Sequence, residues 1–307
     1  MNSKRSEVAK KFVKQKALFS MLIPFIIYVF IFNYIPVAGW IMAFQNYNPV
    51  LGFKNSKWVG IDNFKLLFSD YDFWMAMRNT LSISIIKLFL TFVAAVTLAL
   101  MINEVKNTFF KRSVQTISYL PHFISWVVAA SIITTILSPE TGILNSILKS
   151  LNIINQPIVW LGEGKYFWWI LGISEVWKET GWNAIVYLSA MTAIDPQLYD
   201  AAAVDGASRL QRIRHITLPG ISNIISILLI LNTGWLLNAG FEQVLLLQNP
   251  LVEEYSQIID TFVIKFGLSM YRYSYATAAG IFKSVVSILL IYATNKLAKR
   301  LNFSQVI

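Results

Sequence analysis

The sequence predicts an all-α, polytopic membrane protein with six transmembrane helices and both termini in the cytoplasm. Three observations predict this fold. The chain is 56% hydrophobic with a mean hydropathy of +0.55. It is only 14% charged, whereas a soluble domain averages about 25%. It also contains six separate apolar stretches long enough to cross a bilayer. A soluble chain this apolar would lack the polar surface to cover itself, whereas lipid can take the place of water around it.

Composition excludes several kinds of functional site. The chain has no cysteine, which excludes a disulfide framework, a thiolate metal site and a cysteine nucleophile. Its two histidines, His122 and His215, are too few for a histidine-rich site, so we expect no metal and no cofactor in this chain. The net charge of +10 is typical of basic cytoplasmic loops in a membrane protein, and we expect no nucleic-acid partner. We also expect no cleavable signal peptide, because the first apolar run is too long.

Six apolar stretches match the roughly 20 residues that span a hydrocarbon core of about 30 Å. The first carries Pro24, Pro36 and Gly39, so it is either a kinked helix or a helix followed by a re-entrant cap. The fifth carries Asn223 and Asn232, which suit a bundle interior better than a lipid-facing surface. The predicted spans are 17–44, 81–103, 114–138, 166–190, 218–241 and 274–298.

The distribution of lysine and arginine predicts the orientation. The two terminal segments and the two loops on their side of the membrane hold 15 of these residues, and the three loops on the other side hold 8. Cytoplasmic loops carry the excess of positive residues, so both termini are assigned to the cytoplasm. The predicted segments are a basic cytoplasmic tail (1–16), a transmembrane domain (17–298) and a C-terminal cytoplasmic tail (299–307).

The loop 45–80 is rich in aromatic residues and is predicted to face outside. Its sequence does not resemble a membrane span, and an interfacial helix near residues 62–68 would place Trp and Tyr at headgroup level. The aromatic residues are Tyr47, Phe53, Trp58, Phe64, Phe68, Tyr71, Phe73 and Trp74.

The loop 195–219 carries the strongest local signals for structure. Asp195 is a good N-cap residue and Pro196 suits the first position of a helix. Gly206 suits the left-handed residue that ends such a helix, and Ser208 with Gln211 forms a capping box that starts a second one. The loop is therefore predicted to form two short helices joined by a turn on the cytoplasmic side. An ordinary intracellular loop with capped helices would carry the same signals.

The same loop resembles the EAA loop of bacterial importer permeases, in which E-A-A is followed by three residues, a glycine, nine residues and I-x-L-P. Here Asp200-Ala201-Ala202 stands for the triplet, with aspartate where glutamate is usual. Gly206 stands for the glycine, and Ile216-Thr217-Leu218-Pro219 stands for the end. The segments 58–65 and 273–280 are also similar to members of this group. The chain is therefore identified as a member of the maltose-type sugar permeases, in the subgroup that imports oligosaccharides or polysaccharides.

The resemblance implies an architecture, partners and residue roles. It implies the six-helix fold of a type I ABC importer permease in the lipid of a bacterial cytoplasmic (inner) membrane. Such a subunit pairs with a second, similar permease and with two ATPase subunits, and receives sugar from an extracytoplasmic binding protein. ATP and Mg²⁺ would be held by the ATPase, so this chain would not be an enzyme. The loop 195–219 would be the coupling helix that docks on the ATPase, through Asp200, Ala201, Ala202, Asp205, Gly206, Ile216, Leu218 and Pro219.

Charged and polar residues inside predicted spans are candidates for the substrate pathway, because a charge at the bilayer centre costs about 2.5–3.5 kcal/mol on insertion scales. Glu175 and Glu179 are one turn apart and Lys178 can pair with either, so this set contacts sugar or forms an internal ion pair. Part of the polar set of the fifth span shares a helical face, since Asn238 is three residues from Trp235 and four from Glu242. The set either lines the pathway or bonds to neighbouring helices. Lys87 and Lys283 are expected to pair or to snorkel. The pathway candidates are Glu175, Trp177, Lys178, Glu179, Asn232, Trp235, Asn238 and Glu242.

Two other classes of protein are weighed against this prediction. No phosphate-binding loop of the form G-x-x-x-x-G-K-[ST] is found, since the nearest segment, 162–166, lacks the upstream glycine and ends in tyrosine. Energy must therefore come from a partner or from an ion gradient, and an ion-coupled secondary sugar transporter is the alternative. It would need two matched halves, which the sequence lacks. A membrane-embedded glycosyltransferase would need an acidic cluster, and Asp62, Asp70 and Asp72 are better explained by turns and caps.

Overall fold

The chain folds almost entirely into helices, and the computed structural model describes residues 15–300. The predicted basic tail lies outside the described residues up to residue 14, and the predicted C-terminal tail lies outside them from residue 301. Within the described range, Asn46 pairs with Lys57 in a short antiparallel pair of strands. The elements in chain order are α2 (Lys16–Val29), η1 (Phe30–Tyr34), η2 (Ile35–Phe44), β1 (Gln45–Asn46), α3 (Gly52–Asn55), β2 (Lys57–Trp58), α4 (Asp62–Ser69), α5 (Tyr71–Glu104), α6 (Thr108–Tyr119), η3 (Leu120–Phe123), α7 (Trp126–Ile136), α8 (Ile143–Ser150), η4 (Trp160–Gly162), α9 (Gly164–Thr192), α10 (Pro196–Val204), α11 (Arg209–Arg212), η5 (Ile213–Thr217), α12 (Leu218–Gly220), α13 (Ser222–Gly234), η6 (Leu236–Asn238), α14 (Phe241–Leu247), η7 (Pro250–Val252), α15 (Glu253–Ser256), α16 (Ile259–Ile264), η8 (Lys265–Ser269) and α17 (Tyr273–Arg300).

The described residues contain 3 helices that are long and apolar enough to cross a membrane, and 2 bent pairs that would each do so as one broken span. Helix α9, which has 29 residues, is also long enough, but Glu175, Lys178 and Glu179 lie near its middle. All six predicted spans therefore fall on helical segments, while the number of crossings stays a prediction. The three helices are Leu18–Phe44, Tyr71–Glu104 and Tyr273–Arg300, and the pairs are Thr108–Phe123 with Trp126–Ile136 and Arg209–Gly220 with Ser222–Gly234.

Helix α5 begins at Tyr71, earlier than the predicted residue 81. Asp70 caps it, because its carboxylate accepts a hydrogen bond from the backbone N–H two residues on, at 2.9 Å. Its first turns lie in the predicted loop 45–80, and their polar residues bind the chain after α14. The Asn79 side-chain amide donates to the carbonyls of Glu254 and Gln257 at 2.8 and 2.9 Å. The predicted loop 45–80 is therefore helical over its last ten residues, 71–80.

Two spans that were predicted as continuous helices are broken. The third bends by 102° between η3 and α7, where Pro121 lies in η3 and the Ser125 hydroxyl caps α7. The fifth bends by 58° next to Ile221. It unwinds again at Ala239 and Gly240, whose φ angles of +45° and +75° are left-handed. Hydropathy averaged over a whole span does not reveal the two bends, since each bent pair of helices is apolar enough when taken together. Breaks at membrane depth need neighbouring groups that bind the freed backbone carbonyls.

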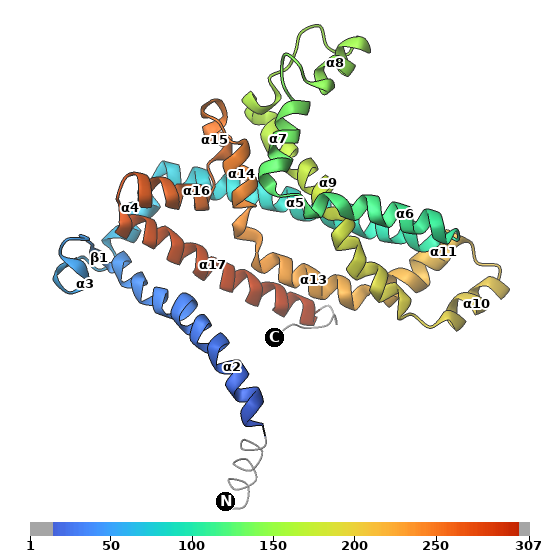
Figure 1. Ribbon diagram of the computed structural model, residues 1–307, viewed down its shortest axis with the longest axis horizontal. Helices are drawn as coiled ribbons and strands as arrows, with labels where there is room; N and C mark the ends of the chain where they lie inside the picture. The colour runs from blue at the N-terminus through green and yellow to red at the C-terminus, as the bar shows by residue number, and fades with distance from the viewer. Residues whose placement is uncertain (1–14, 301–307) are drawn as a thin grey trace, which may run out of the picture.

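Helices α5 and α9 pack side by side at the centre of the fold (Figure 1). Glycines allow the close approach of neighbouring helices. A Cβ added at Gly172 of α9 would lie 2.7 Å from Ile86 of α5, and one at Gly181 would lie 2.0 Å from the backbone oxygen of Ser118 in α6. One buried apolar cluster joins α5, α9 and the start of α13, and includes Ala95, Ala99, Ile102, Ala184, Leu188, Met191 and Ile221.

The first span stands apart from the bundle. Figure 1 shows α2, in blue, running away from the other helices, and its large apolar side chains are exposed. The helix passes through Pro24, changes its winding in η1, and continues to Phe44 as one span. The continuous helix favours the kinked-helix alternative over a helix followed by a re-entrant cap. Figure 1 also shows that α3 and β1 lie at one end of the long axis and α10 at the opposite end.

Candidate functional site

The loop 195–219 forms the two capped helices that its sequence predicts. The Asp195 carboxylate accepts a hydrogen bond from the backbone N–H two residues on, at 2.9 Å, and Pro196 is the first residue of α10. Gly206 follows the end of this helix with a φ of +73°. A side chain at such a position meets the backbone oxygen, which is why glycine is favoured there. Ser208 and Gln211 form the predicted capping box at the start of α11.

The tip of this loop is exposed, whereas its root is packed. Val204 is 89% exposed and Leu210 is 74% exposed, and α10 projects at one end of the molecule (Figure 1). The hydroxyl groups of Tyr199 and Thr217 are hydrogen-bonded at 2.9 Å, and Thr217 is buried. This bond fixes α10 to the segment that leads into α13. Of the predicted coupling residues, Asp200, Ala201, Asp205, Gly206 and Pro219 are exposed, and Ala202, Ile216 and Leu218 are half-buried.

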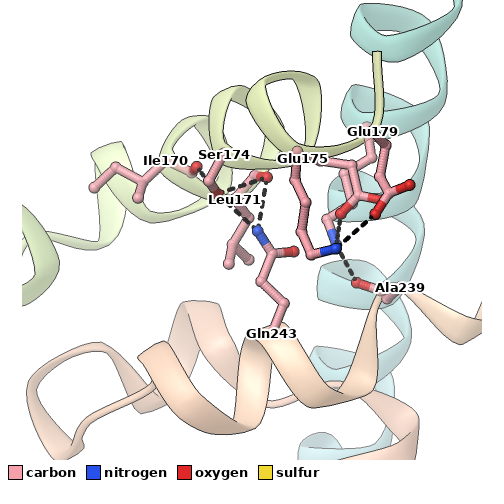
Figure 2. A network of polar contacts seen from close by, with 9 residues as sticks. Ile170, Leu171, Ser174, Glu175, Glu179, Ala239 and Gln243 are labelled. Atoms are coloured by element: carbon pink, nitrogen blue, oxygen red, sulfur yellow. Dashed lines mark hydrogen bonds and ion pairs between the residues drawn. The ribbon is translucent and has the colours of Figure 1, made fainter. Parts of the chain in front are cut away.

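A network of charges lies deep in the helical bundle, where the break after α13 meets α5 and α9. The Lys87 ammonium lies 3.2 Å from a Glu175 carboxylate oxygen and donates a hydrogen bond of 3.0 Å to the backbone carbonyl of Ala239. Figure 2 shows Glu175 from α9 and Ala239 from the break pointing toward one another. Beside them, the buried Gln243 amide donates to the Leu171 carbonyl at 3.0 Å and so ties α14 to α9.

A second pair has the same arrangement at the other break. The Lys178 ammonium donates to the backbone carbonyl of His122 at 2.8 Å and lies 3.1 Å from Glu179. The other oxygen of Glu179 lies 2.7 Å from Nδ1 of His122. The His122 ring stacks on Trp182, with ring centroids 4.3 Å apart and an angle of 3° between the planes. Helix α9 is thereby joined to the 102° bend between η3 and α7.

Both lysines bind a carbonyl that a helix break leaves free, and α9 supplies a counter-charge to each from successive turns. The Trp126 ring lies near both ammonium groups, with 6.0 Å from its centroid to Lys87 and 5.3 Å to Lys178. This geometry fits the internal ion-pair interpretation. It differs from the expected pairing in one respect, because Glu175 pairs with Lys87 of α5 and not with Lys178. Lys283 also pairs, with Asp260 at 2.5 Å.

A cavity of about 290 Å³ opens beside this network, between α5, α9 and the segment from α13 to η6. Its wall includes polar residues that were not predicted from the sequence, among them Ser84, Thr91 and Asn183. The hydroxyl oxygens of Ser84 and Thr91 are buried and have no hydrogen-bond partner within residues 15–300. Ser84, Lys87 and Thr91 recur at i, i+3 and i+7, so the polar stripe on α5 was a readable signal. The predicted residues that line the cavity are Glu175, Asn232, Trp235 and Asn238.

The other predicted pathway residues lie elsewhere. Trp177 lines a separate apolar hollow of about 450 Å³ between α7 and α9. Lys178 and Glu179 are engaged at the first break, as described above. Glu242 is exposed on α14. The chain breaks between Asn238 and α14, so the expectation that Asn238 and Glu242 share one helical face is wrong.

The acidic residues near the start of α5 have structural roles. Asp62 pairs with Lys65 at 2.9 Å. Asp70 caps α5 and also accepts a hydrogen bond from the Tyr275 hydroxyl. In the part of the chain that the structure describes, no group of three or more His, Cys, Asp or Glu side chains is arranged to hold a metal ion. Asp70 therefore has the cap role that the sequence favours over a catalytic cluster, and Asp62 forms a surface ion pair.

Comparison with known proteins identifies the family of this chain. Residues 88–303 match the family described as binding-protein-dependent transport system inner membrane component. Protein LplB of Bacillus subtilis (strain 168) is 43% identical over 287 residues, which cover 94% of this chain and 90% of that protein. The polygalacturonan/rhamnogalacturonan transport system permease protein YteP of the same organism is 41% identical over 297 residues, which cover 97% of this chain and 92% of that protein.

A solved structure matches nearly the whole fold. It is the crystal structure of a bacterial alginate ABC transporter in complex with an alginate pentasaccharide-bound periplasmic protein. One of its chains is 40% identical with a TM-score of 0.88, and the match covers 97% of this chain and 99% of that chain. The all-α architecture of an ABC importer permease is thereby confirmed, and the protein is a multi-pass membrane protein. The chain belongs to the family of binding-protein-dependent transport system inner membrane components.

Proposed function

We propose that this chain forms half of the translocation pathway of an ATP-driven importer for oligosaccharides or polysaccharide fragments. The observation that carries the proposal is the projecting pair α10–α11, which leaves the apolar Val204 and Leu210 exposed at one end of the bundle. Exposed apolar side chains that gather on a projection are typical of a protein contact. The matched relatives support the substrate class, since one is a polygalacturonan/rhamnogalacturonan permease and another belongs to an alginate transporter.

The proposed partners follow from this role. A second permease would supply the other half of the pathway, and two ATPase subunits would bind the coupling loops of the two permeases. ATP and Mg²⁺ would be held by the ATPase, while an extracytoplasmic binding protein would deliver the sugar. The alginate transporter, which was crystallised with a substrate-bound periplasmic protein, supports the last of these partners.

Helix α9 is proposed to transmit the movement of the ATPase into the membrane. Only residues 193–195 separate α9 from α10, and they form a tight turn in which Ile194 N–H donates to the Met191 carbonyl at 3.2 Å. The same helix carries Glu175 and Glu179, which hold Lys87 and the bend at His122. A displacement of α10 would therefore move both ion pairs and change the walls of the 290 Å³ cavity.

The cavity has the chemistry that a sugar requires. Asn183, Asn232 and Asn238 offer amides for hydroxyl groups, and Trp235, which is 71% exposed, offers an aromatic face for a sugar ring. The unpartnered hydroxyls of Ser84 and Thr91 add further donors and acceptors. Binding of sugar here would satisfy polar groups that have no hydrogen-bond partner within residues 15–300.

The proposed orientation places six spans in the membrane with both termini and the loop 195–219 in the cytoplasm. Because the sequence has no cysteine, single cysteines introduced at Asp200 and at Asn55 would report the side of each loop by labelling with a membrane-impermeant reagent. Labelling of Asn55→Cys but not of Asp200→Cys from outside intact cells is expected. The reverse pattern would contradict the orientation.

Purification of the intact complex tests the proposal. The chain is tagged, extracted from its native membrane in mild detergent, and captured, and the proteins that come with it are identified by mass spectrometry. A Walker-motif ATPase and a second permease with its own EAA-like loop are expected. Recovery of the chain alone, together with transport under an ion gradient without ATP, would favour the ion-coupled alternative.

A further inference from the structure

A second polar hollow lies at the end of the molecule opposite α10. Its volume is about 550 Å³, and it is built from two parts of the chain that are far apart in sequence. One part is the segment from β1 to β2 and the other is the turn between η8 and α17. Figure 1 shows β1 and α3 at this end of the long axis. The residues with chemistry suited to a ligand are Asn46, Tyr47, Asn55, Lys57, Tyr271 and Tyr273.

The hollow is held in shape by hydrogen bonds. The strand pairing places Asn46 directly opposite Lys57, so their side chains share one face. The Tyr47 backbone N–H donates to the Ser274 hydroxyl at 2.9 Å, which joins the two parts of the wall. The Ser56 hydroxyl closes the turn between the strands by donating to the Gly52 carbonyl at 2.7 Å. The wall is therefore formed before any ligand arrives.

Tyr271 is held in a conformation that its side chain disfavours. Its φ is +56°, in the left-handed region where the Cβ of an L-residue approaches the backbone oxygen. It follows η8 at the position that glycine usually fills at a helix end. The ring is nonetheless 73% exposed, so burial does not compensate for the strain. Backbone strain at an exposed residue that is not compensated by burial is typical of a functional site.

The aromatic rings surround the hollow and do not cover one another. Tyr47 and Tyr273 meet edge to face, with centroids 6.1 Å apart and 84° between their planes. Tyr271 and Tyr273 meet at 63° with centroids 6.3 Å apart. Tyr47 also packs on Phe53, with centroids 5.0 Å apart and 35° between their planes, whereas Tyr271 is exposed and offers its ring to a ligand. Within residues 15–300, the side chains of Asn46, Asn55 and Lys57 make no hydrogen bond or ion pair.

We propose that this hollow binds a sugar unit that carries a carboxylate, as part of an oligosaccharide on its way to the membrane. Aromatic faces would pack on the apolar C–H face of the ring, the free amides would bind hydroxyl groups, and the Lys57 ammonium would pair with the carboxylate. Among the described residues no acidic side chain lines the hollow, so the charge of Lys57 is available to the ligand. The class of ligand in this inference rests on the proposed function. The position of the site rests on the geometry of the hollow.

Binding is tested on the whole transporter in lipid nanodiscs, without the binding protein. The probes are trigalacturonate and its neutral methyl ester, observed by saturation-transfer NMR. Wild type is expected to bind trigalacturonate more tightly than the ester. Lys57→Met should reduce that preference by two- to fivefold, which is about the range of an exposed ion pair. Tyr271→Gly should weaken binding of both probes, while the thermal midpoint holds or rises because glycine accepts the left-handed backbone.

A matched control is Tyr71→Ala, which removes a tyrosine that is 70% exposed but does not line the hollow. Its binding of both probes should equal that of wild type. Wild-type binding by both Lys57→Met and Tyr271→Gly would overturn the inference. The inference would also be overturned if the variants no longer bind the sugar-free binding protein but keep the NMR signal of the sugar probes. The hollow would then be a protein contact. ATP-driven uptake is measured in parallel, and its absence would refute the proposed function while the NMR result still decides this site.

Discussion

Replacing Lys87 by methionine removes the only charged group that joins α5 to both α9 and the break at Ala239 in the described structure. The side chain of Lys87 is 9% exposed and that of Glu175 is 24% exposed. The substitution leaves a mostly buried carboxylate without its partner and a backbone carbonyl without its donor. Methionine keeps much of the apolar volume of the lysine stem. The loss of unfolding free energy therefore measures the effect of removing the charge.

The expected loss of unfolding free energy is about 3–5 kcal/mol, the range for breaking a buried ion pair from one side. The double variant Lys87→Met/Glu175→Gln removes the orphaned charge but still leaves the Ala239 carbonyl unpaired, which costs about 1–3 kcal/mol. The double variant should therefore be more stable than Lys87→Met alone by about 2 kcal/mol. An exposed pair is the control. Lys65→Met breaks the Lys65–Asp62 contact, whose side chains are 67% and 64% exposed, and should cost below about 1 kcal/mol.

The free energy of unfolding is measured by steric trapping in bicelles, which keeps the protein in lipid. Expression level and helical content by circular dichroism establish that each variant inserts. If Lys87→Met loses no more unfolding free energy than Lys65→Met, the claim that Lys87 stabilises the break at Ala239 is refuted. A double variant that is less stable than Lys87→Met would refute the pairing with Glu175.

Three further predictions concern other parts of the chain. Gly206→Val should abolish most sugar-stimulated ATP hydrolysis, because valine disfavours the left-handed φ of +73°. Insertion should be unaffected, because no atom of residues 15–300, other than those of the glycine and its chain neighbours, lies within 4 Å of an added Cβ. Gly60→Val, at an equally open position with φ of +61°, is its control and should leave hydrolysis unchanged. Gly181→Ala should lower stability by about 1–3 kcal/mol in steric trapping, because its Cβ would lie 2.0 Å from the Ser118 carbonyl oxygen. An unchanged stability would contradict that close packing. Ser84→Ala should leave stability unchanged or raise it, since the buried hydroxyl has no partner within residues 15–300. It should nevertheless raise the KM for uptake. An unchanged KM would remove Ser84 from the pathway.

The loop 195–219 was predictable in detail because each of its signals is local. The cap at Asp195, the left-handed Gly206 and the capping box at Ser208 each depend on residues within a few positions along the chain. The same holds for the helix near residues 62–68, which the structure places in α4. Local chemistry fixed these elements before any packing was known.

The broken spans were not predictable in the same way. Hydropathy is averaged over a whole span and hides short breaks, although Pro121 and Gly240 lie at them in the sequence. The breaks are stable because Lys87 and Lys178 bind carbonyls that lie 152 and 56 positions away in the chain. Such partners exist only after the helices have packed. The charges themselves were visible in the sequence, but the assignment of Glu175 to Lys87 required the structure.

The most direct test of the central claim is uptake of radiolabelled trigalacturonate into proteoliposomes that hold the purified complex and its binding protein. The account predicts uptake that requires ATP on the side of the loop 195–219, that is insensitive to ionophores, and that Gly206→Val abolishes. Uptake driven by a proton or sodium gradient without ATP, at the same rate in Gly206→Val as in wild type, would contradict it.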